Sequence, residues 1–531
     1  MSLFKRYVKK LQGEMIMKKR RFLSAVAAVM SVALIAGGCG EKKNDVSDNT
    51  VTWWTGYGGS VANGTNSLAD NLCIQELMKR TGVNIEFSQA SSTDWSEQFN
   101  LMLASGEYTD IFMYPMYTYP GGPQMAIDEN IIMPLNDVFK KYCPNITAYL
   151  NEHPEIDKMI KTDEGQYYCF PPIYGDEYLQ VYRGPIIRQD LLDKLGLERP
   201  ETIDEWTNVL TRFKNELGIE VPLTFHSNYL FTFLEAYGTI PELYIDNGKV
   251  KYGATDPAFK DAVAKMNEWY TLGLLDNNIA TIDSKFINQN MLNGRSGATV
   301  GATGGGIGTL MKQKTDDPSF NLTAAKYPVL KKGDTPMYGQ RVHAAVLDST
   351  SCASLSTQCK NIEAAAKVLD YGYSEEGQML FNFGIEGVSY NMIDGYPTYT
   401  DIITKDKQNR SIGTMLSYYS CPSGIWPSIR DKRYMEQNAE TPQQKESIEI
   451  WGQTDAKIHM MPQVTLSAEE SEQVSTIETD LKTYVSSMML KFITGVEPMS
   501  NFDAFTNKVK EMKADKYVSI YQKAYDRYMK R

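Results

Sequence analysis

Strand and helix patterns alternate between residues 51 and 114, and this alternation limits the folds open to the 531-residue chain more than any other property. The segments 51–56, 83–87 and 110–114 read as strands, and the segments between them carry apolar residues at helical spacing. Gly106 ends the second helical pattern. Such strand–helix–strand units place their strands in a mostly parallel sheet. We therefore expect an α/β fold.

Later signals predict helices added around this sheet. A capping box begins at Thr202, and an Asn-Gly turn at Asn247 predicts a hairpin. Asp256 is expected to cap a further helix, and two amphipathic helices, around 502–512 and 517–528, close the chain. A chain of this length exceeds one ordinary core, so we expect two large lobes or three smaller units.

The N-terminus has the pattern of an export signal. Four basic residues precede the apolar run Phe22–Ala36, which is shorter than the roughly 20 residues that span a bilayer. Two glycines and Cys39 follow, and then a polar linker. This arrangement resembles a bacterial lipobox, in which the cysteine is diacylated, although Ala36 stands where leucine is usual.

We therefore expect residues 1–38 to be a signal peptide, with an extension before a good start at Met17, and 39–50 to be a lipid-anchored linker. Cys39 would hold the exported protein to the outer face of the cell membrane. The alternative is a plain secretory signal with an unmodified cysteine.

The charge balance argues against a nucleic-acid partner. Without residues 1–38 the chain has 46 Lys and Arg against 64 Asp and Glu, a formal net charge of −18. An anionic ligand is compatible with this balance, because a local arginine can serve a cleft. Six cysteines follow Cys39, and export permits disulfides without indicating their pairing.

Signatures of enzymes and metal sites are absent from the sequence. It contains no G-x-S-x-G, Walker, H-E-x-x-H or C-x-x-C motif and no EF-hand-type calcium run. The glycine-rich stretch 301–308 lacks the Walker lysine, so we interpret it as a tight loop at a helix start. Asp and Glu number 65, so carboxylate pairs carry no specific glycosidase signal. We expect neither an enzyme nor a cofactor.

The carboxyl ends of the three predicted strands share a chemistry that suits sugars. Ligands of open α/β sheets bind outside these ends. The loops there read TGYGGS, SQASST and YPMYTYPGG. Their aromatic rings can stack on the C–H faces of sugars, and their hydroxyl groups and small residues can meet the ligand's hydroxyls.

Five stretches carry a family resemblance: LASGEYTDIF, IIRQDLLDKLGLERPETIDEWTNVLTRFK, DNGKVKYGATDPAFKDAVAKMNEWYTLGLLDNN, DYGYSEEGQMLFNFGIEGVSY and FITGVEPMSNFDAFTNKVKEMKADKYVSIYQKAYDRY. With the lipobox, they resemble bacterial extracellular solute-binding proteins of family 1, in particular the long lipoprotein branch for aldouronate or oligosaccharide transport. They run in order from about Val51 to the C-terminus.

The resemblance implies a periplasmic-binding-protein-like fold, with two α/β lobes, a hinge and extra C-terminal helices. Residues 51–180 would begin the N-terminal lobe, 181–370 would be mainly the C-terminal lobe with hinge crossings, and 371–531 would add helices to both. The cleft would close on an oligosaccharide by hinge motion, and a monomeric protein would deliver it to the permease subunits of an ABC importer.

The resemblance also bears on metal binding and on structural residues. Many relatives carry a calcium-like segment after the helix that contains Trp206; this chain reads FKNELGIEVPLTF there, so no metal is expected. The family's motif residues look structural here: Arg188, Asp190, Thr202, Trp206, Gly384 and Gly387.

Our candidates for ligand contact are Trp54, Tyr57, Tyr114, Tyr117, Tyr119, Tyr174, Arg183, Asn228 and Trp426. Alternation along the first strand sends one of Trp53 and Trp54 inward, and Trp54 is nearer the loop. Arg183 suits an anionic or hydroxyl-rich ligand, or else an interdomain salt bridge. Trp426 lies in a Pro/Gly-rich loop, which favours a stacking platform, whereas Trp206, Trp269 and Trp451 have core patterns.

Two other functions fit the same cleft. A surface-tethered glycoside hydrolase or lyase would need a catalytic acid and base there. A sensor component that presents its ligand to a membrane kinase would have the same cleft as an importer's receptor.

Overall fold

The computed structural model describes residues 49–57, 67–91, 94–314, 316–339, 346, 352–408, 410–421 and 426–531. The predicted signal peptide and the lipid-anchor cysteine, Cys39, lie outside these residues. Within them, no helix combines the length and hydrophobicity that a membrane span requires. The six cysteines they contain form no disulfide with one another.

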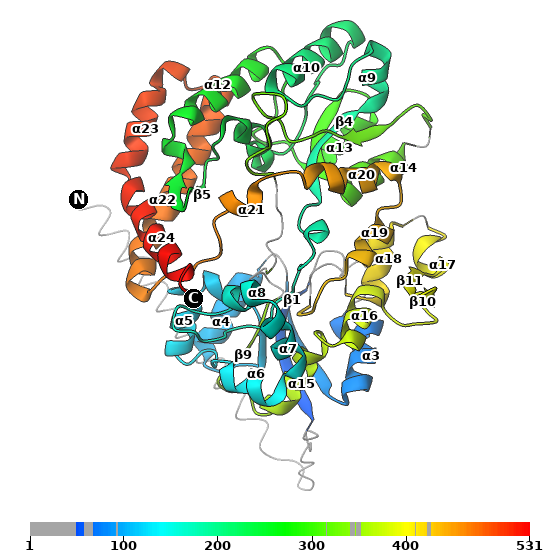
Figure 1. The fold of residues 1–531 in the computed structure, drawn as a ribbon, viewed down its shortest axis with the longest axis vertical. Coiled ribbons are helices and arrows are strands. Elements are labelled where there is room, and N and C mark those ends of the chain that lie inside the picture. Colours follow the sequence, from blue (N-terminus) through cyan, green and yellow to red (C-terminus); the bar gives the residue numbers. More distant parts are fainter. Residues whose placement is uncertain are drawn as a thin grey trace, which may run out of the picture. The chain divides into compact units, whose positions relative to one another are not determined.

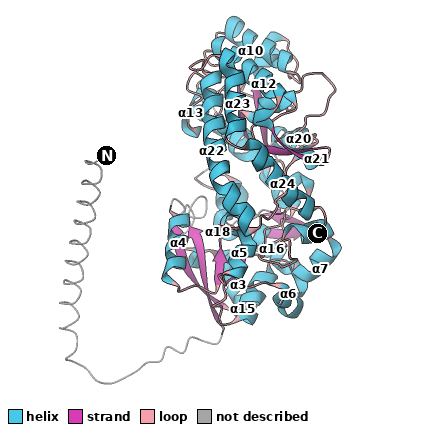
Figure 2. Ribbon diagram, turned by 90° about the vertical axis from the view of Figure 1, so that its left-hand side faces the viewer, coloured by secondary structure: helices cyan, strands magenta, loops and turns pink. Residues whose placement is uncertain are grey.

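A four-stranded sheet in the order β2-β1-β3-β9 supports the first lobe (Figures 1 and 2). β2 and β3 both pair in parallel with β1, which confirms the sheet predicted for the start of the chain. β9 pairs antiparallel with β3 and comes from far along the chain. The elements of this lobe are β1 (Thr50–Tyr57), α3 (Leu72–Thr81), β2 (Asn84–Ser91), α4 (Trp95–Ser105), β3 (Ile111–Met113), α5 (Gly122–Asp128), α6 (Asn136–Tyr142), α7 (Pro144–Glu152), α8 (Pro154–Met159), β9 (Ala353–Leu355), α15 (Ile362–Tyr371) and α16 (Glu375–Phe383).

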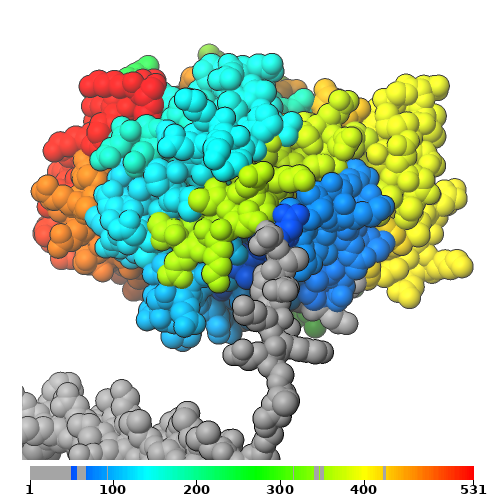
Figure 3. Space-filling view, turned by 90° about the horizontal axis from the view of Figure 1, so that it is seen from below, coloured from blue at the N-terminus to red at the C-terminus, as the bar shows by residue number. Residues whose placement is uncertain are grey.

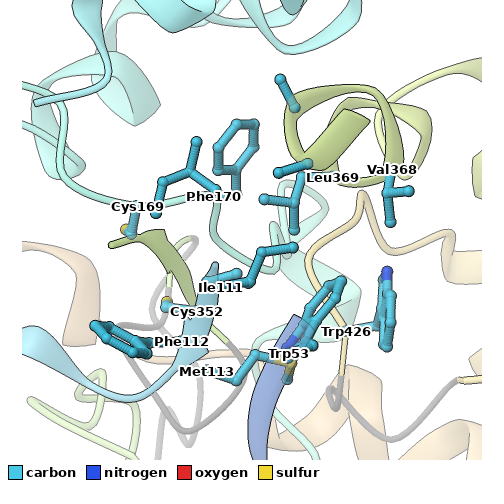
Figure 4. Close-up of a cluster of buried hydrophobic side chains, with 14 of the residues drawn as sticks. Trp53, Ile111, Phe112, Met113, Cys169, Phe170, Cys352, Val368, Leu369 and Trp426 are labelled. Atoms are coloured by element: carbon cyan, nitrogen blue, oxygen red, sulfur yellow. The ribbon is translucent and has the colours of Figure 1, made fainter. Parts of the chain in front are cut away.

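Both tryptophans of β1 are buried, because side chains cover both faces of this central strand. Trp53 is fully buried against Trp426, with 4.3 Å between ring centroids (Figure 4). Trp54, on the opposite face, is 4% exposed and lies 5.2 Å from the ring of Phe99 in α4. Our expectation that only one ring of the pair would belong to the core was wrong.

The second lobe is built on the three-stranded antiparallel sheet β7-β4-β8. The hairpin β5–β6 turns at Asn247-Gly248, as predicted, and the C-terminal helices close the lobe, with α22 packed along α12 (Figure 1). Its elements are β4 (Arg183–Arg188), α9 (Gln189–Leu195), α10 (Ile203–Leu217), α11 (Phe231–Leu234), β5 (Leu243–Asp246), β6 (Lys249–Tyr252), α12 (Pro257–Thr271), α13 (Ser284–Leu292), β7 (Ala298–Ala302), α14 (Thr309–Gln313), β8 (Leu322–Ala324), α20 (Pro442–Trp451), α21 (Ala456–His459), α22 (Ala468–Ile493), α23 (Phe502–Glu511) and α24 (Ala514–Tyr528).

A smaller cluster of buried side chains joins Tyr174 to a late segment of the chain. That segment comprises β10 (Tyr390–Ile393), β11 (Tyr396–Tyr399), α17 (Asp401–Thr404), α18 (Ile412–Tyr419) and α19 (Lys432–Asn438). Contacts of α16 and α18 with α3 bring this late segment beside the early chain, and Figure 3 shows the two side by side in yellow and blue.

Each of the two large cores is completed by residues from a second part of the chain. The first core joins residues 51–173 to 346–429, and the second joins 187–325 to 474–520. The chain therefore passes between the cores three times. We predicted that a new segment of the chain begins at residue 371. The chain already contributes Val346 to the first core. The lobe boundaries themselves stay a prediction.

Two local predictions need correction. Asp256 does occupy the N-cap position of α12, but its carboxylate makes no capping bond and instead accepts a hydrogen bond from the Tyr244 hydroxyl at 2.6 Å. The glycine-rich stretch is helical rather than a loop: a π-helical segment over Thr303–Gly308 continues directly into α14.

The motif residues have structural contacts. Arg188 donates two hydrogen bonds to Asp190, at 2.7 and 2.6 Å, and both side chains are buried. Thr202 and Glu205 complete the predicted capping box of α10. Gly384 ends α16 with φ at 87°, and a Cβ there would lie 2.3 Å from Ser389 Oγ.

Replacing Gly384 with alanine should destabilise the protein by about 2–4 kcal/mol, because positive φ and overpacking add their costs. Gly387→Ala is the matched control: its φ is 78°, but a Cβ there meets nothing within 4 Å, so about 1–2 kcal/mol is expected. Urea denaturation of both variants measures the difference. Equal losses would show that the contact with Ser389 does not matter.

Candidate functional site

A cavity of about 370 Å³ lies in the second lobe and brings together two of the predicted ligand residues, Arg183 and Asn228. Most of its walls are aromatic, aliphatic or thioether side chains. The lining residues are Arg183, Asn228, Tyr229, Phe231, Ile240, Pro241, Glu242, Leu243, Tyr338, Gly339, Met460 and Met461. Mostly apolar walls with a few convergent polar groups are typical of small-molecule sites.

Arg183 is fixed by its place at the start of β4. It pairs with Ala302 of β7, and its carbonyl accepts a hydrogen bond from the Tyr327 hydroxyl. The next residue, Gly184, lets the ring of Trp451 approach so closely that a Cβ would lie 2.5 Å from it. Backbone pairing and close packing therefore hold the base of the arginine side chain.

The guanidinium group of Arg183 lies over the ring of Tyr229, 4.5 Å from its centroid. Cation–π contacts of this kind are worth about 0.5–2 kcal/mol, depending on desolvation. The Nε atom is buried and has no hydrogen-bond partner in the described part of the chain. Tyr229 therefore orients the guanidinium group, and the Nε–H of Arg183 makes no hydrogen bond within the described residues.

Asn228 and Tyr229 belong to a 3₁₀ turn, Ser227–Tyr229, whose N-cap is His226. The Nδ1 atom of His226 accepts a hydrogen bond from the Asn228 backbone N–H at 3.1 Å. The Asn228 side chain is exposed, so its amide can donate to and accept from a bound molecule.

A buried carboxyl group supports the part of the lining formed by Tyr338 and Gly339. Gly339 donates its backbone N–H to Oε2 of Glu235 at 2.5 Å, and Glu235 is 1% exposed. Burial raises the pKa of Glu235 well above its ordinary value, because the charged carboxylate loses its hydration inside the protein. Its Oε1 has no partner among the described residues. The carboxyl group thus anchors the Tyr338–Gly339 part of the lining through this hydrogen bond.

The remaining wall comes from the segment after α21. Met460 bridges to Tyr244 of β5, and His459 donates from Nδ1 to the Ile245 carbonyl at 2.9 Å. The carboxylate of Glu242 is exposed at this cavity, and after burial its charge is the largest cause of the raised pKa of Tyr338. Tyr338 therefore keeps its phenolic proton at neutral pH.

Chemically, the cavity can bind and orient a molecule. Its rings and thioethers suit the apolar faces of a ligand, and the amide, the guanidinium and the Tyr338 hydroxyl suit ligand hydroxyls or charge. Across the described residues, no group of three or more His, Cys, Asp or Glu side chains is arranged to hold a metal ion.

The other predicted residues lie away from this cavity. Tyr114 is buried and stacks on Phe99 at 3.7 Å. Tyr117 is 49% exposed, and the hydroxyl of Tyr119 donates to Glu129 at 2.5 Å. Tyr57 lies in β1, and its side chain is outside the described residues.

Two further candidates are buried in the cores. Tyr174 is 3% exposed within the smaller cluster. Trp426 is fully buried between Trp53 and Phe381, so the expectation that its loop would leave the ring open was wrong. The packing of Trp54, Tyr114, Tyr174 and Trp426 does not favour ligand contact, and their roles stay predictions.

A second hollow, of about 630 Å³, contains none of the predicted residues. It lies between β11, α19 and α20, and three of its polar side chains already have partners. The Tyr396 hydroxyl donates to Glu436 at 2.8 Å, and Gln437 bonds to the backbone of Pro397 and Tyr399. We therefore favour the first cavity as the binding site.

Sequence reasoning missed Tyr229, Tyr338, Glu235 and the pair Met460–Met461. The methionine pair precedes a proline in a segment without helical periodicity, which is a usable signal for apolar residues outside a core. Glu235 has no such signal, because burial of a carboxyl group depends on contacts distant in the chain.

The chain is similar to known proteins in both sequence and structure. A sequence model of the family described as bacterial extracellular solute-binding protein matches residues 59–379. The fructooligosaccharide ABC transporter substrate-binding protein FusA of Streptococcus pneumoniae serotype 4 is 24% identical over 490 residues, which are 86% of this chain and 87% of FusA. Lipoprotein LipO of Bacillus subtilis is 24% identical over 358 residues, 64% of this chain and 67% of LipO.

Among solved structures, the alginate-binding protein AlgQ2 without calcium ion superposes with a TM-score of 0.71 at 24% identity. The match covers 90% of this chain and 98% of AlgQ2. The two-lobed solute-binding fold predicted from the sequence is therefore confirmed.

Replacing Glu235 with glutamine should stabilise the protein at pH 8. Because the folded-state pKa of Glu235 is raised, the wild type loses stability as pH rises above the ordinary value of 4.5, whereas glutamine does not titrate and still accepts from Gly339. Melting temperatures from pH 4.5 to 8 should show a gain that shrinks at the acid end. The exposed Glu107→Gln is the control, and a gain independent of pH would contradict the account.

Proposed function

The chain belongs to the bacterial extracellular solute-binding protein family, and on that premise we propose that it captures an oligosaccharide and delivers it to an ABC importer. The observation that carries the proposal is the cavity where Arg183, Asn228 and Tyr229 meet Tyr338. Rings beside an amide and a guanidinium group match the alternating C–H faces and hydroxyls of a sugar.

The position of this cavity supports a role in ligand capture. Arg183 lies where the chain enters the second core, and Tyr338 lies where it leaves, so both belong to passages between the cores. A ligand that contacts such passages can favour one arrangement of a hinge over another. FusA, the oligosaccharide-binding relative, spans nearly the same length.

We further propose that a diacylated Cys39 anchors the protein to the outer face of the cell membrane and that the receptor is a monomer. The lipobox-like sequence before Cys39 supports the anchor, as does the similarity to LipO, which is named a lipoprotein. The permease subunits of the importer would be its protein partners.

A glycoside hydrolase or lyase in the same cavity is the weaker candidate. Glu242 is the only carboxylate among the lining residues, whereas glycosidases use two carboxyl groups that flank the scissile bond. Glu235 is not among the lining residues, and its carboxyl group accepts a hydrogen bond from the Gly339 backbone N–H.

The binding proposal predicts a saturable thermal shift. The soluble chain from Glu41 onward is screened against neutral and uronic-acid oligosaccharides, and a ligand at 100 times its Kd should add about 2.7 kcal/mol. Tyr229→Ala and Asn228→Ala should weaken binding, and Tyr525→Ala, in α24 and outside the cavity lining, is the control. Product formation from a bound ligand would favour an enzyme, and the absence of any shift would contradict oligosaccharide binding.

The anchor proposal predicts that Cys39→Ala releases the protein from the membrane fraction into the medium, because the acyl chains supply the membrane affinity. Fractionation and intact-mass measurement of cells expressing both forms test this. Equal membrane retention of the variant, without a lipid adduct in the wild type, would contradict a lipid anchor.

A further inference from the structure

Two cysteines from distant parts of the chain meet in the first core. Cys73 lies in the first turn of α3, and Cys421 follows the end of α18. Both side chains are fully buried, and their thiols are in hydrogen-bond contact with each other. Contacts of α3 with α16 and α18 bring these segments together (Figure 1). The structure shows both cysteines as free thiols.

The position of Cys73 is fixed by Asn71, which is the N-cap residue of α3 and is 1% exposed. The Oδ1 atom of Asn71 accepts a hydrogen bond from the Cys73 backbone N–H at 2.9 Å. Its Nδ2 atom donates to the Ser417 carbonyl of α18, also at 2.9 Å. One buried side chain therefore caps the helix that contains Cys73 and ties it to the helix that precedes Cys421.

Helix α16 holds both cysteines through two consecutive carbonyl groups. The Cys73 thiol donates to the Leu380 carbonyl at 3.7 Å, and the Cys421 backbone N–H donates to the Phe381 carbonyl at 3.0 Å. The Cys421 carbonyl accepts a hydrogen bond from Arg430 at 2.6 Å. A disulfide requires two cysteines whose side chains already lie close and point toward each other. Noncovalent contacts therefore bring these two thiols together without a covalent bond.

The family of this protein is extracellular, and disulfides form and persist outside the cytosol. In the folded protein, burial and then the neighbouring Cys421 thiol raise the pKa of the Cys73 thiol well above its ordinary value. The thiolate is the form that attacks a disulfide, so the folded dithiol exchanges slowly with an oxidant. Oxidation of this pair therefore belongs to folding, before α18 packs against α3.

We propose that Cys73 and Cys421 form a disulfide site, which is oxidised as the exported chain folds. Two S–H bonds break and one S–S bond forms. The two electrons and two protons pass to the disulfide of a thiol–disulfide oxidoreductase, which becomes a dithiol. The new bond ties α3 to the segment that returns from later in the chain, and these are two of the parts that the first core joins. Neither cysteine lines the ligand cavity.

The test identifies the linked peptides in the protein after export. The full chain is recovered from the envelope of a bacterial host, alkylated with N-ethylmaleimide in denaturant without reductant, and digested with trypsin. We expect the peptides 44–79 and 411–430 to be joined through Cys73 and Cys421 and to separate on reduction. The other four cysteines after Cys39 should carry the adduct. Protein kept in the cytosol, where thiols stay reduced, should carry it on all six.

Melting temperatures measure what the bond contributes. Refolding the exported wild type in reductant should lower its Tm by about 5 °C, because a cross-link between distant residues restricts the unfolded chain. Cys73→Ala and Cys421→Ala should each abolish this response to reductant. Cys143→Ala, another fully buried cysteine of the first core, is the matched control and should keep the response. The peptide map of the wild type does not depend on any variant.

Three results overturn the inference. The first is an N-ethylmaleimide adduct on both Cys73 and Cys421 of the exported protein. The second is a linked peptide that joins either of them to a different cysteine. The third is a response of Tm to reductant that persists in the Cys73→Ala variant. Each of these results leaves the proposed oligosaccharide binding standing, because that proposal is tested by ligand and not by redox state.

Discussion

Two separate hydrophobic cores, each completed by a segment that returns from later in the chain, determine the rest of this structure. The first core joins residues 51–173 to residues 346–429, and the second joins 187–325 to 474–520. Neither lobe can bury its apolar surface from one continuous stretch. The chain must therefore pass between the cores. The connecting stretches lie next to these two packed cores.

The binding cavity follows from this constraint. Its lining includes Arg183 and Tyr338–Gly339, from stretches that join the two cores, and Tyr229 and Leu243, which pack against the second core. Hydrogen bonds to buried groups hold these connecting stretches in place. Gly339 donates its backbone N–H to Glu235, and the Tyr327 hydroxyl donates to the Arg183 carbonyl. Within the described part of the chain, the buried Nε of Arg183 has no hydrogen-bond partner.

Local patterns predicted the elements well, because each is fixed by neighbours in sequence. The parallel strands at the start of the chain, the capping box at Thr202, the Asn247-Gly248 hairpin and the family itself are confirmed. Trp54 and Trp426 show the limit: their burial depends on α4 and on contacts across almost 400 residues, which no local pattern records. Of nine proposed ligand residues, Arg183 and Asn228 line the cavity. Aromatic rings serve cores and ligands equally, so a local pattern does not separate the two uses.

The most direct test of the account is a crystal structure of the soluble chain with an oligosaccharide that shifts its melting temperature. The account predicts density for the ligand in the cavity lined by Asn228, Tyr229 and Tyr338. Density elsewhere, with this cavity empty, would contradict it.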